Sequence, residues 1–178
     1  MTASAKGPLH GIKVLELGTL IAGPFCARML AEFGAEVIKI ETPDGGDPLR
    51  QWRILRDGTS LWWRVQARNK KSLALNMKSE QGRDIARRLA LDADIIIENY
   101  RPGVLEKWGL CFELLKAANP AVIMVRLSGY GQTGPMRDQP GQSCQPPPAK
   151  PAGWGRNWAN TTKLFCGSWV IPLKRLPH

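Results

Sequence analysis

A glycine-rich segment, Gly129-Tyr-Gly-Gln-Thr-Gly134, has the spacing G-x-G-x-x-G that holds the phosphates of dinucleotides in many proteins. In such sites the third glycine opens a helix whose free amides bind the pyrophosphate, and an acidic residue about 20 positions later binds the ribose. Here Pro135 and Pro140 follow, no helical period begins, and no Asp or Glu occurs after Asp138. The pattern therefore predicts a loop at the end of a strand and not a nucleotide fingerprint.

The chain in front of this loop alternates short apolar runs with stretches of helical spacing. Strands are expected at five runs, residues 12–17, 36–41, 72–76, 94–98 and 121–127. The uninterrupted apolar core of the fourth run is typical of a central parallel strand that is covered on both faces. This order predicts an α/β fold, a Rossmann-like, doubly wound parallel sheet.

Turn and capping residues predict where the helices begin and end. Pro24 is expected at the first position of the first helix, and Gly34 just beyond its end. Ser79 is expected to cap the helix that precedes the fourth strand.

Residues 42–59 are rich in Pro, Gly, Asp and Arg, which predicts a long surface loop that serves as a lid or contacts a partner. In the short helix expected at 61–67, packing explains the two tryptophans better than stacking on a ligand.

In a doubly wound sheet, ligands bind beyond the carboxyl ends of the strands. This rule selects four loops, residues 17–24, 75–78, 99–102 and 128–135. They offer small residues, free amides near Pro24, and the cationic side chains of Lys78 and Arg101, which suit a ligand that carries phosphate. Asn69-Lys-Lys71 lies at the opposite strand end, where these charges are either part of a site or simply solvated.

Five motifs in order resemble those of class III CoA-transferases, the formyl-CoA and carnitine-CoA transferase type, whose relatives include α-methylacyl-CoA racemase. The similarity runs from about Leu9 to Gly141. The motifs are Gly11-Ile-Lys-Val-Leu-Glu-Leu with Ala22-Gly-Pro24, Gly34-Ala-Glu-Val-Ile-Lys-Ile-Glu41, Asn69-Lys-Lys-Ser72, Glu98-Asn-Tyr-Arg-Pro-Gly103 and Ser128-Gly-Tyr-Gly-Gln-Thr-Gly-Pro135.

The resemblance implies an enzyme that moves CoA between an acyl-CoA and a carboxylic acid through an aspartyl-CoA thioester, with CoA as substrate and no prosthetic group. It also implies a second domain and an interlocked homodimer of chains about twice this length. Thr42 stands where relatives can present an arginine. The positions that correspond to CoA contacts in the family are Ile21, Ala22, Leu75, Asn76, Met77, Lys78, Asn99, Tyr100, Arg101 and Lys107.

Composition limits the other function classes. No stretch approaches the length of a membrane-spanning helix, and no N-terminal run has the form of a secretion signal, so a cytoplasmic protein that binds no membrane is expected. Four cysteines without a C-x-x-C pair and only two histidines predict neither disulfides nor a metal site. Half of the net charge of +10 lies in residues 139–178, which contain five basic residues and no acidic one.

The last part of the sequence, residues 142–178, differs in character from residues 1–141, which match the large domain of the family. It is rich in Pro and Trp, and a segment such as Gln145-Pro-Pro-Pro148 predicts extended, unstructured chain. Because this part also lacks the aspartate that the family uses, we expect an incomplete sheet, a truncated chain and no turnover. An out-of-frame or alternatively spliced translation explains such a tail, and a basic tail that binds nucleic acid or a partner is the alternative.

The leading interpretation is therefore the CoA-binding portion of a CoA-transferase, inactive as this chain alone, with no nucleic acid as partner. The alternative is a non-catalytic α/β module that binds CoA or nucleotides. A racemase-type relative is disfavoured, because racemases of the family use a His/Asp pair and the histidines here, His10 and His178, lie near the two ends of the chain.

Overall fold

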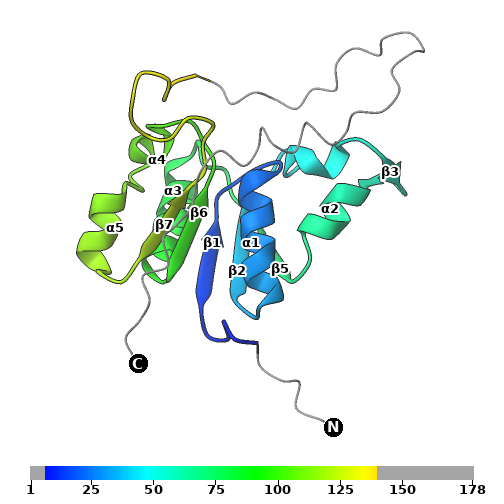
Figure 1. Cartoon of the computed structure of the whole chain (residues 1–178), viewed down its shortest axis with the longest axis horizontal. Coiled ribbons are helices and arrows are strands. Elements are labelled where there is room, and N and C mark those ends of the chain that lie inside the picture. Colours follow the sequence, from blue (N-terminus) through cyan, green and yellow to red (C-terminus); the bar gives the residue numbers. More distant parts are fainter. Residues whose placement is uncertain (1–6, 140–178) are drawn as a thin grey trace, which may run out of the picture. The chain divides into compact units, whose positions relative to one another are not determined.

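The computed structural model describes residues 7–139. Five parallel strands form one sheet in the order β5-β2-β1-β6-β7 (Figure 1). The strands are β1 (Lys13–Glu16), β2 (Glu36–Glu41), β5 (Lys70–Ala74), β6 (Ile95–Glu98) and β7 (Ile123–Arg126). The strand order reverses between β1 and β6, so the prediction of a Rossmann-like, doubly wound sheet is confirmed. The segment predicted to be unstructured, residues 142–178, lies outside the described residues.

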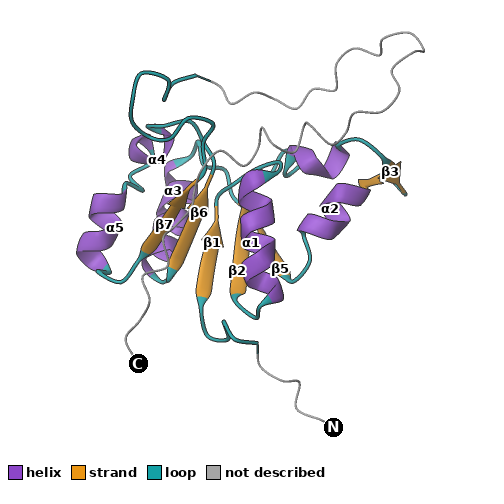
Figure 2. Cartoon of the chain, in the orientation of Figure 1, coloured by secondary structure: helices purple, strands orange, loops and turns teal. Residues whose placement is uncertain are grey.

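Helices cover both faces of this sheet, as Figure 2 shows with α1 in front of the strands and α3 behind them. On one face, α1 (Ala22–Glu32) packs its small residues Ala27 and Ala31 against Val14, Val37 and Ile97. The other face is covered by α3 (Glu80–Leu91), α4 (Val104–Lys107) and α5 (Phe112–Ala118). The apolar side chains of the parallel strands are thus buried on both sides, as their sequence pattern requires.

The local signals for helix ends act mostly as predicted. Ser79 caps α3, because its hydroxyl accepts a hydrogen bond of 3.1 Å from the Gly82 amide. Gly34 follows α1 with a φ of 100°, and the Gly34 and Ala35 amides donate to the carbonyls of Ala31 and Leu30. Pro24 was expected at the first helical position but is the third residue of α1. The amides of the first turn have no helical acceptor, so the lack of an amide at Pro24 costs no helical hydrogen bond.

The segment between β2 and β5 is more ordered than the predicted surface loop. It contains the 3-10 helix η1 (Pro48–Gln51), the two-stranded hairpin of β3 (Leu55–Arg56) and β4 (Thr59–Ser60), and the helix α2 (Leu61–Gln66). The prediction of a long surface loop over residues 42–59 is wrong for this part of the chain, because it forms these short elements and because Asp47 and Leu49 are almost fully buried.

The aromatic residues of this segment mostly pack within it. Trp63 is buried beneath the Arg50 guanidinium, which lies 3.9 Å from the ring centre. Trp62 is 42 % exposed and contacts the edge of Trp52. Packing, the favoured interpretation of the tryptophan pair, therefore holds for Trp63.

Candidate coenzyme site at the carboxyl edge of the sheet

The loops that follow β1 and β6 are joined at the point where the strand order reverses. The Asn99 side chain accepts a hydrogen bond of 2.8 Å from the Thr19 amide and donates one of 2.8 Å to the Thr19 carbonyl. Gly18 lies against Gly23 so closely that a Cβ on Gly18 would be 2.9 Å from the Gly23 Cα. Only glycine fits this contact, which brings the loop directly onto the start of α1.

The N-terminus of α1 faces outward from this loop. Ile21 and Ala22 are exposed, no side chain caps the helix, and its first turn contains no acidic residue. Leu20 has a φ of 63°, a left-handed conformation that is energetically unfavourable for any residue other than glycine. An open helix N-terminus offers free amides and a partial positive charge, which suit an anionic group.

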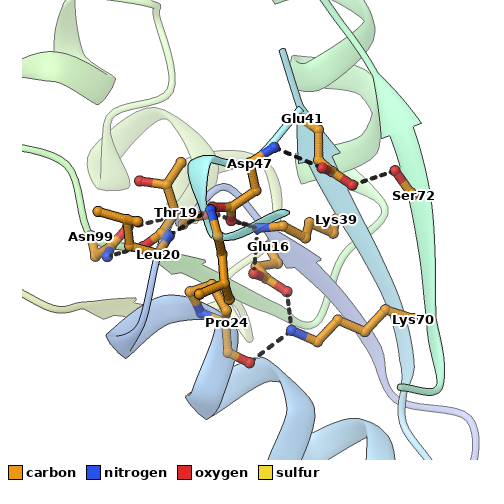
Figure 3. Close-up of polar contacts among 12 residues, drawn as sticks. Glu16, Thr19, Leu20, Pro24, Lys39, Glu41, Asp47, Lys70, Ser72 and Asn99 are labelled. Carbon is orange, nitrogen blue, oxygen red and sulfur yellow. Dashed lines mark hydrogen bonds and ion pairs between the residues drawn. The ribbon is translucent and has the colours of Figure 1, made fainter. Parts of the chain in front are cut away.

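Beneath this loop lies a cluster of four charged residues whose side chains are buried, which we call the charge cluster: Glu16, Lys39, Asp47 and Lys70 (Figure 3). The Lys39 ammonium lies 2.8 Å from the Glu16 carboxylate and 2.8 Å from the Asp47 carboxylate. The Lys70 ammonium lies 2.7 Å from the other Glu16 oxygen. Two ammonium groups thus balance two carboxylates where an unpaired charge would be very costly.

The charge cluster also binds the backbone at three points, two in the loop and one in the first turn of α1. Lys39 donates to the Gly18 carbonyl at 2.6 Å, and Lys70 donates to the Pro24 carbonyl at 2.7 Å. The Asp47 carboxylate accepts a hydrogen bond of 3.0 Å from the Leu20 amide. Burial lowers the pKa of Lys70, although pairing with Glu16 raises it. The loop between β1 and α1 is therefore fixed by buried charges and not by its own side chains.

A second pair, Glu41 and Arg50, continues this network toward β5. The Glu41 carboxylate accepts hydrogen bonds from Arg50, from the Ser72 hydroxyl and from the Asp47 amide. Burial opposes its ionisation, but these bonds outweigh burial and lower the pKa of Glu41 to about 2. In dinucleotide-binding folds, an acidic residue about 20 positions after the glycines of the first βα loop binds the ribose. Glu41 lies at about that position after Gly18, but its oxygens already accept hydrogen bonds from protein groups.

The ten predicted contact residues all lie on or near the carboxyl edge of the sheet, and the structure brings several of them together. Leu75, Met77 and Tyr100 pack on the same buried apolar cluster, and Tyr100 contacts the edge of Trp108. Burial, with the nearby carboxylates of Asp47 and Glu98, raises the pKa of Tyr100 to about 12. Its hydroxyl therefore stays protonated at neutral pH.

The polar residues among the ten face solvent or shape the backbone. The Asn76 side chain accepts a hydrogen bond of 3.0 Å from the Lys78 amide and so shapes the turn before α3. Lys78, Arg101 and Lys107 are exposed, and within residues 7–139 none of them forms an ion pair with an acid. Contact of the ten residues with CoA stays a prediction.

The glycine-rich loop that follows β7 contains no helix up to Gln139, the last described residue, so this stretch lacks the helix start that a dinucleotide fingerprint uses. Arg126 at the end of β7 bridges the carboxylates of Glu98 and Glu106, at 2.8 and 2.9 Å. A cavity of about 270 Å³ beside this bridge is lined also by Gln132 and Asp138. Asp138 is exposed and pairs with Arg137 at 3.3 Å.

The charge cluster is what the sequence analysis missed. The sequence predicts the third strand from residue 72 and leaves open whether Lys70 belongs to a site or is solvated. In the structure β5 begins at Lys70, two residues earlier, and carries its side chain inward to Glu16. Lys71 alternates to the other side and is exposed. The available signal was a charge between apolar neighbours, as in Leu15-Glu16-Leu17 and Ile38-Lys39-Ile40, since a charge within a covered strand must find a partner.

Other kinds of site find less support in the described part of the chain. Between Gly7 and Gln139, no three His, Cys, Asp or Glu side chains come together as metal ligands would. No helix of this part is long and apolar enough to cross a membrane. Cys26 and Cys111 are both free thiols, and burial raises the pKa of Cys26, so that it is a poor nucleophile.

Comparison with known proteins gives consistent matches over the first three quarters of the chain. The family model described as CoA-transferase family III matches residues 9–143. Succinyl-CoA--D-citramalate CoA-transferase of Chloroflexus aurantiacus is 53% identical over 135 residues, which are 75% of this chain and 34% of that protein. Human succinyl-CoA:glutarate CoA-transferase is 43% identical over 135 residues, which are 75% of this chain and 31% of that protein.

A solved structure supports the same match in three dimensions. The crystal structure of a CAIB/BAIF family protein from Brucella suis has a TM-score of 0.71 and 40% identity. The match covers 76% of this chain and 37% of that one. The chain thus spans about a third of the length of the curated relatives it matches.

Proposed function

The chain belongs to CoA-transferase family III, and we propose that it forms the CoA-binding part of an enzyme that moves CoA between an acyl-CoA and a carboxylic acid. The observation that carries this proposal is the loop between β1 and α1 together with the first turn of α1. Buried charges and Asn99 hold this stretch at four backbone positions, from Gly18 to Pro24. Such a fixed, glycine-containing loop supports an open helix N-terminus at the place where doubly wound sheets bind ligands.

Two features of this edge suit the charges of CoA. The free amides at the start of α1, next to Ile21 and Ala22, would bind a phosphate oxygen. The exposed cations Lys78, Arg101 and Lys107 would pair with the remaining phosphate charge. The apolar side chains of Leu75 and Met77 would line the path of the uncharged pantetheine portion.

Transfer itself requires a nucleophile that this part of the chain does not supply. In the proposed route, an aspartate carboxylate attacks the thioester carbonyl and expels the CoA thiolate, which leaves a mixed anhydride. The thiolate then attacks the aspartyl carbonyl, forms the aspartyl-CoA thioester and releases the acyl group as a carboxylate. Asp138 is the last acid of the sequence and lies exposed on the surface beside Arg137, so we propose that the 178-residue chain binds CoA without turnover.

The donor of the whole enzyme is proposed from the relatives. Both curated relatives described above are named for succinyl-CoA, and their acceptors are different carboxylic acids. Succinyl-CoA is therefore the donor we propose, with a carboxylic acid as acceptor. A racemase role is less well supported, because His10 is exposed and precedes β1, at the opposite edge of the sheet from the candidate site.

A nucleotide-binding module without catalysis is the second candidate. It is favoured by the strand order alone and opposed by the state of Glu41, whose oxygens already accept bonds from Arg50 and Ser72. Without a free carboxylate at this position, the site lacks the usual acceptor for a ribose hydroxyl.

Calorimetric titration of the 178-residue chain tests these functions directly. We expect one CoA per chain, weaker binding of NAD, and weaker CoA binding as salt rises. Arg101→Ala should weaken CoA binding, whereas Lys71→Ala should not, because Lys71 is an exposed cation that pairs with Glu36 on the far side of β5 from the site. Absence of CoA binding, or tighter binding of NAD, would contradict the proposal.

The proposal also predicts a missing activity. Succinyl-CoA mixed with a carboxylic acid and the purified chain should yield no new acyl-CoA by chromatography. Sustained turnover would show that an acid of this chain, with Asp138 the first to replace by Asn, acts as nucleophile.

A further inference from the structure

Asp47, in the segment between β2 and α2, contacts the candidate CoA loop and the groups that hold Asp47 itself in place. Asp47 is 2 % exposed, although it lies among the turn-forming residues Gly45, Gly46 and Pro48. One carboxylate oxygen accepts hydrogen bonds from the Leu20 amide at 3.0 Å and the Leu49 amide at 2.8 Å. The other pairs with Lys39 at 2.8 Å.

Leu20 needs such a partner to keep its conformation. Its φ of 63° is unfavourable for a residue with a side chain, and its side chain is 40 % exposed, so apolar packing does not hold it in place. The hydrogen bond from its amide to Asp47 is the contact that fixes this residue, with Asn99 fixing Thr19 beside it (Figure 3).

The conformation of Leu20 sets the direction of the amides that follow. Ile21 and Ala22 come next in the chain, and α1 starts at Ala22 without a side-chain cap. If Leu20 were free to leave its strained conformation, the first turn of α1 would have to be ordered again each time an anion binds.

We propose that Asp47 is a positioning residue for CoA, which holds Leu20 so that the amides at the start of α1 are arranged before the coenzyme arrives. Asp47 does not touch the ligand and acts through the loop. This inference rests on the CoA-binding function proposed above and adds to it a role for the segment that joins β2 to α2.

Four variants of the 178-residue chain test the role. Asp47→Ala removes the acceptor, and we expect CoA affinity to fall about tenfold, the effect of ordering roughly one residue upon binding. Asp47→Asn keeps an oxygen for the Leu20 amide and should bind CoA more tightly than Asp47→Ala. Leu20→Pro leaves the buried charges intact but removes the donor and excludes a positive φ, so it should lose affinity as well. Leu20→Gly should retain it, because glycine adopts this φ freely.

The matched control is Asp57→Ala, which removes the same charge from the same segment, where Asp57 pairs with Arg64 on the surface. CoA affinity should be unchanged there. Amide hydrogen exchange supplies a readout that simple destabilisation would not give. In Asp47→Ala, exchange should accelerate at Leu20, whose amide loses its acceptor, and at its neighbour Thr19, while Ile96 and Ile97 in the core stay protected.

The outcomes separate the two proposals. Absence of CoA binding by the wild type overturns the proposed function, and this inference with it. Normal binding by the wild type together with unchanged affinity in both Asp47→Ala and Leu20→Pro overturns the positioning role alone. Faster exchange in the loop without loss of affinity also overturns it, because Asp47 would then serve only the stability of the fold.

Discussion

Strands β1 and β2 carry charged residues at both ends, and the two ends behave differently. At their amino ends, Lys13 and Glu36 are exposed, and Lys13 pairs with Asp92 on the surface. At their carboxyl ends, Glu16 and Lys39 are 0 % and 1 % exposed and bind each other. The same two strands thus carry solvated charges at one edge of the sheet and buried charges at the other.

The difference shows what buried charges can do that solvated ones cannot. An exposed pair is screened and exchanges partners with water, so it fixes little. A buried pair must keep every partner, because the loss of one leaves a charge without solvation. The charge cluster uses this requirement to hold the backbone of a loop that has no packing of its own. If the comparison is correct, changes at the carboxyl edge affect both stability and loop order, and changes at the amino edge affect neither strongly.

The largest effect is expected at Glu16, which pairs with both lysines of the charge cluster. Glu16→Gln keeps the shape but leaves Lys39 and Lys70 with one carboxylate, and we expect it to lower the free energy of unfolding by about 3–5 kcal/mol. Urea unfolding of the 178-residue chain, followed by circular dichroism, measures this loss. Glu36→Gln makes the same change at the exposed end of β2. If Glu16→Gln lowers the free energy of unfolding no more than Glu36→Gln does, the buried charges hold the fold no better than the exposed ones.

A smaller, pH-dependent effect is expected at Glu41. Its pKa of about 2 lies below the usual value of 4.5, so its stabilisation is fully present above about pH 4.5 and is lost as the pH falls toward 2. The free energy of unfolding of the wild type should exceed that of Glu41→Gln by about 2 kcal/mol at pH 7. This difference should disappear as the pH falls from about 4.5 toward 2. The gap is measured by unfolding both proteins at matched pH values, and a gap that is constant with pH would contradict the assigned hydrogen bonds.

The sequence predicted the sheet well because its signals are local. Apolar runs such as Ile95-Ile-Ile97 indicate covered parallel strands, and Ser79 and Gly34 act on the residues next to them. The edge at which we propose a ligand site followed from the strand order, and the resemblance selected the same loops. The charge cluster escaped because its members come from three strands and one turn, far apart in sequence. A turn-rich composition around Asp47 predicts exposure, and only the three-dimensional partners Lys39 and Leu20 explain its burial.

The smallest effect is expected at Lys13, the exposed counterpart of Lys39. Lys13→Met removes the ion pair and the hydrogen bond with Asp92. That hydrogen bond is the largest cause of the raised pKa of Lys13. We expect a small decrease in stability that shrinks as salt is added, because solvent and ions already screen this pair. Lys39→Met should instead cause a large decrease that salt barely changes, since its partners are buried. Urea unfolding of both variants at low and high salt distinguishes the two edges, and equal salt dependence would show that the charge cluster is solvated after all.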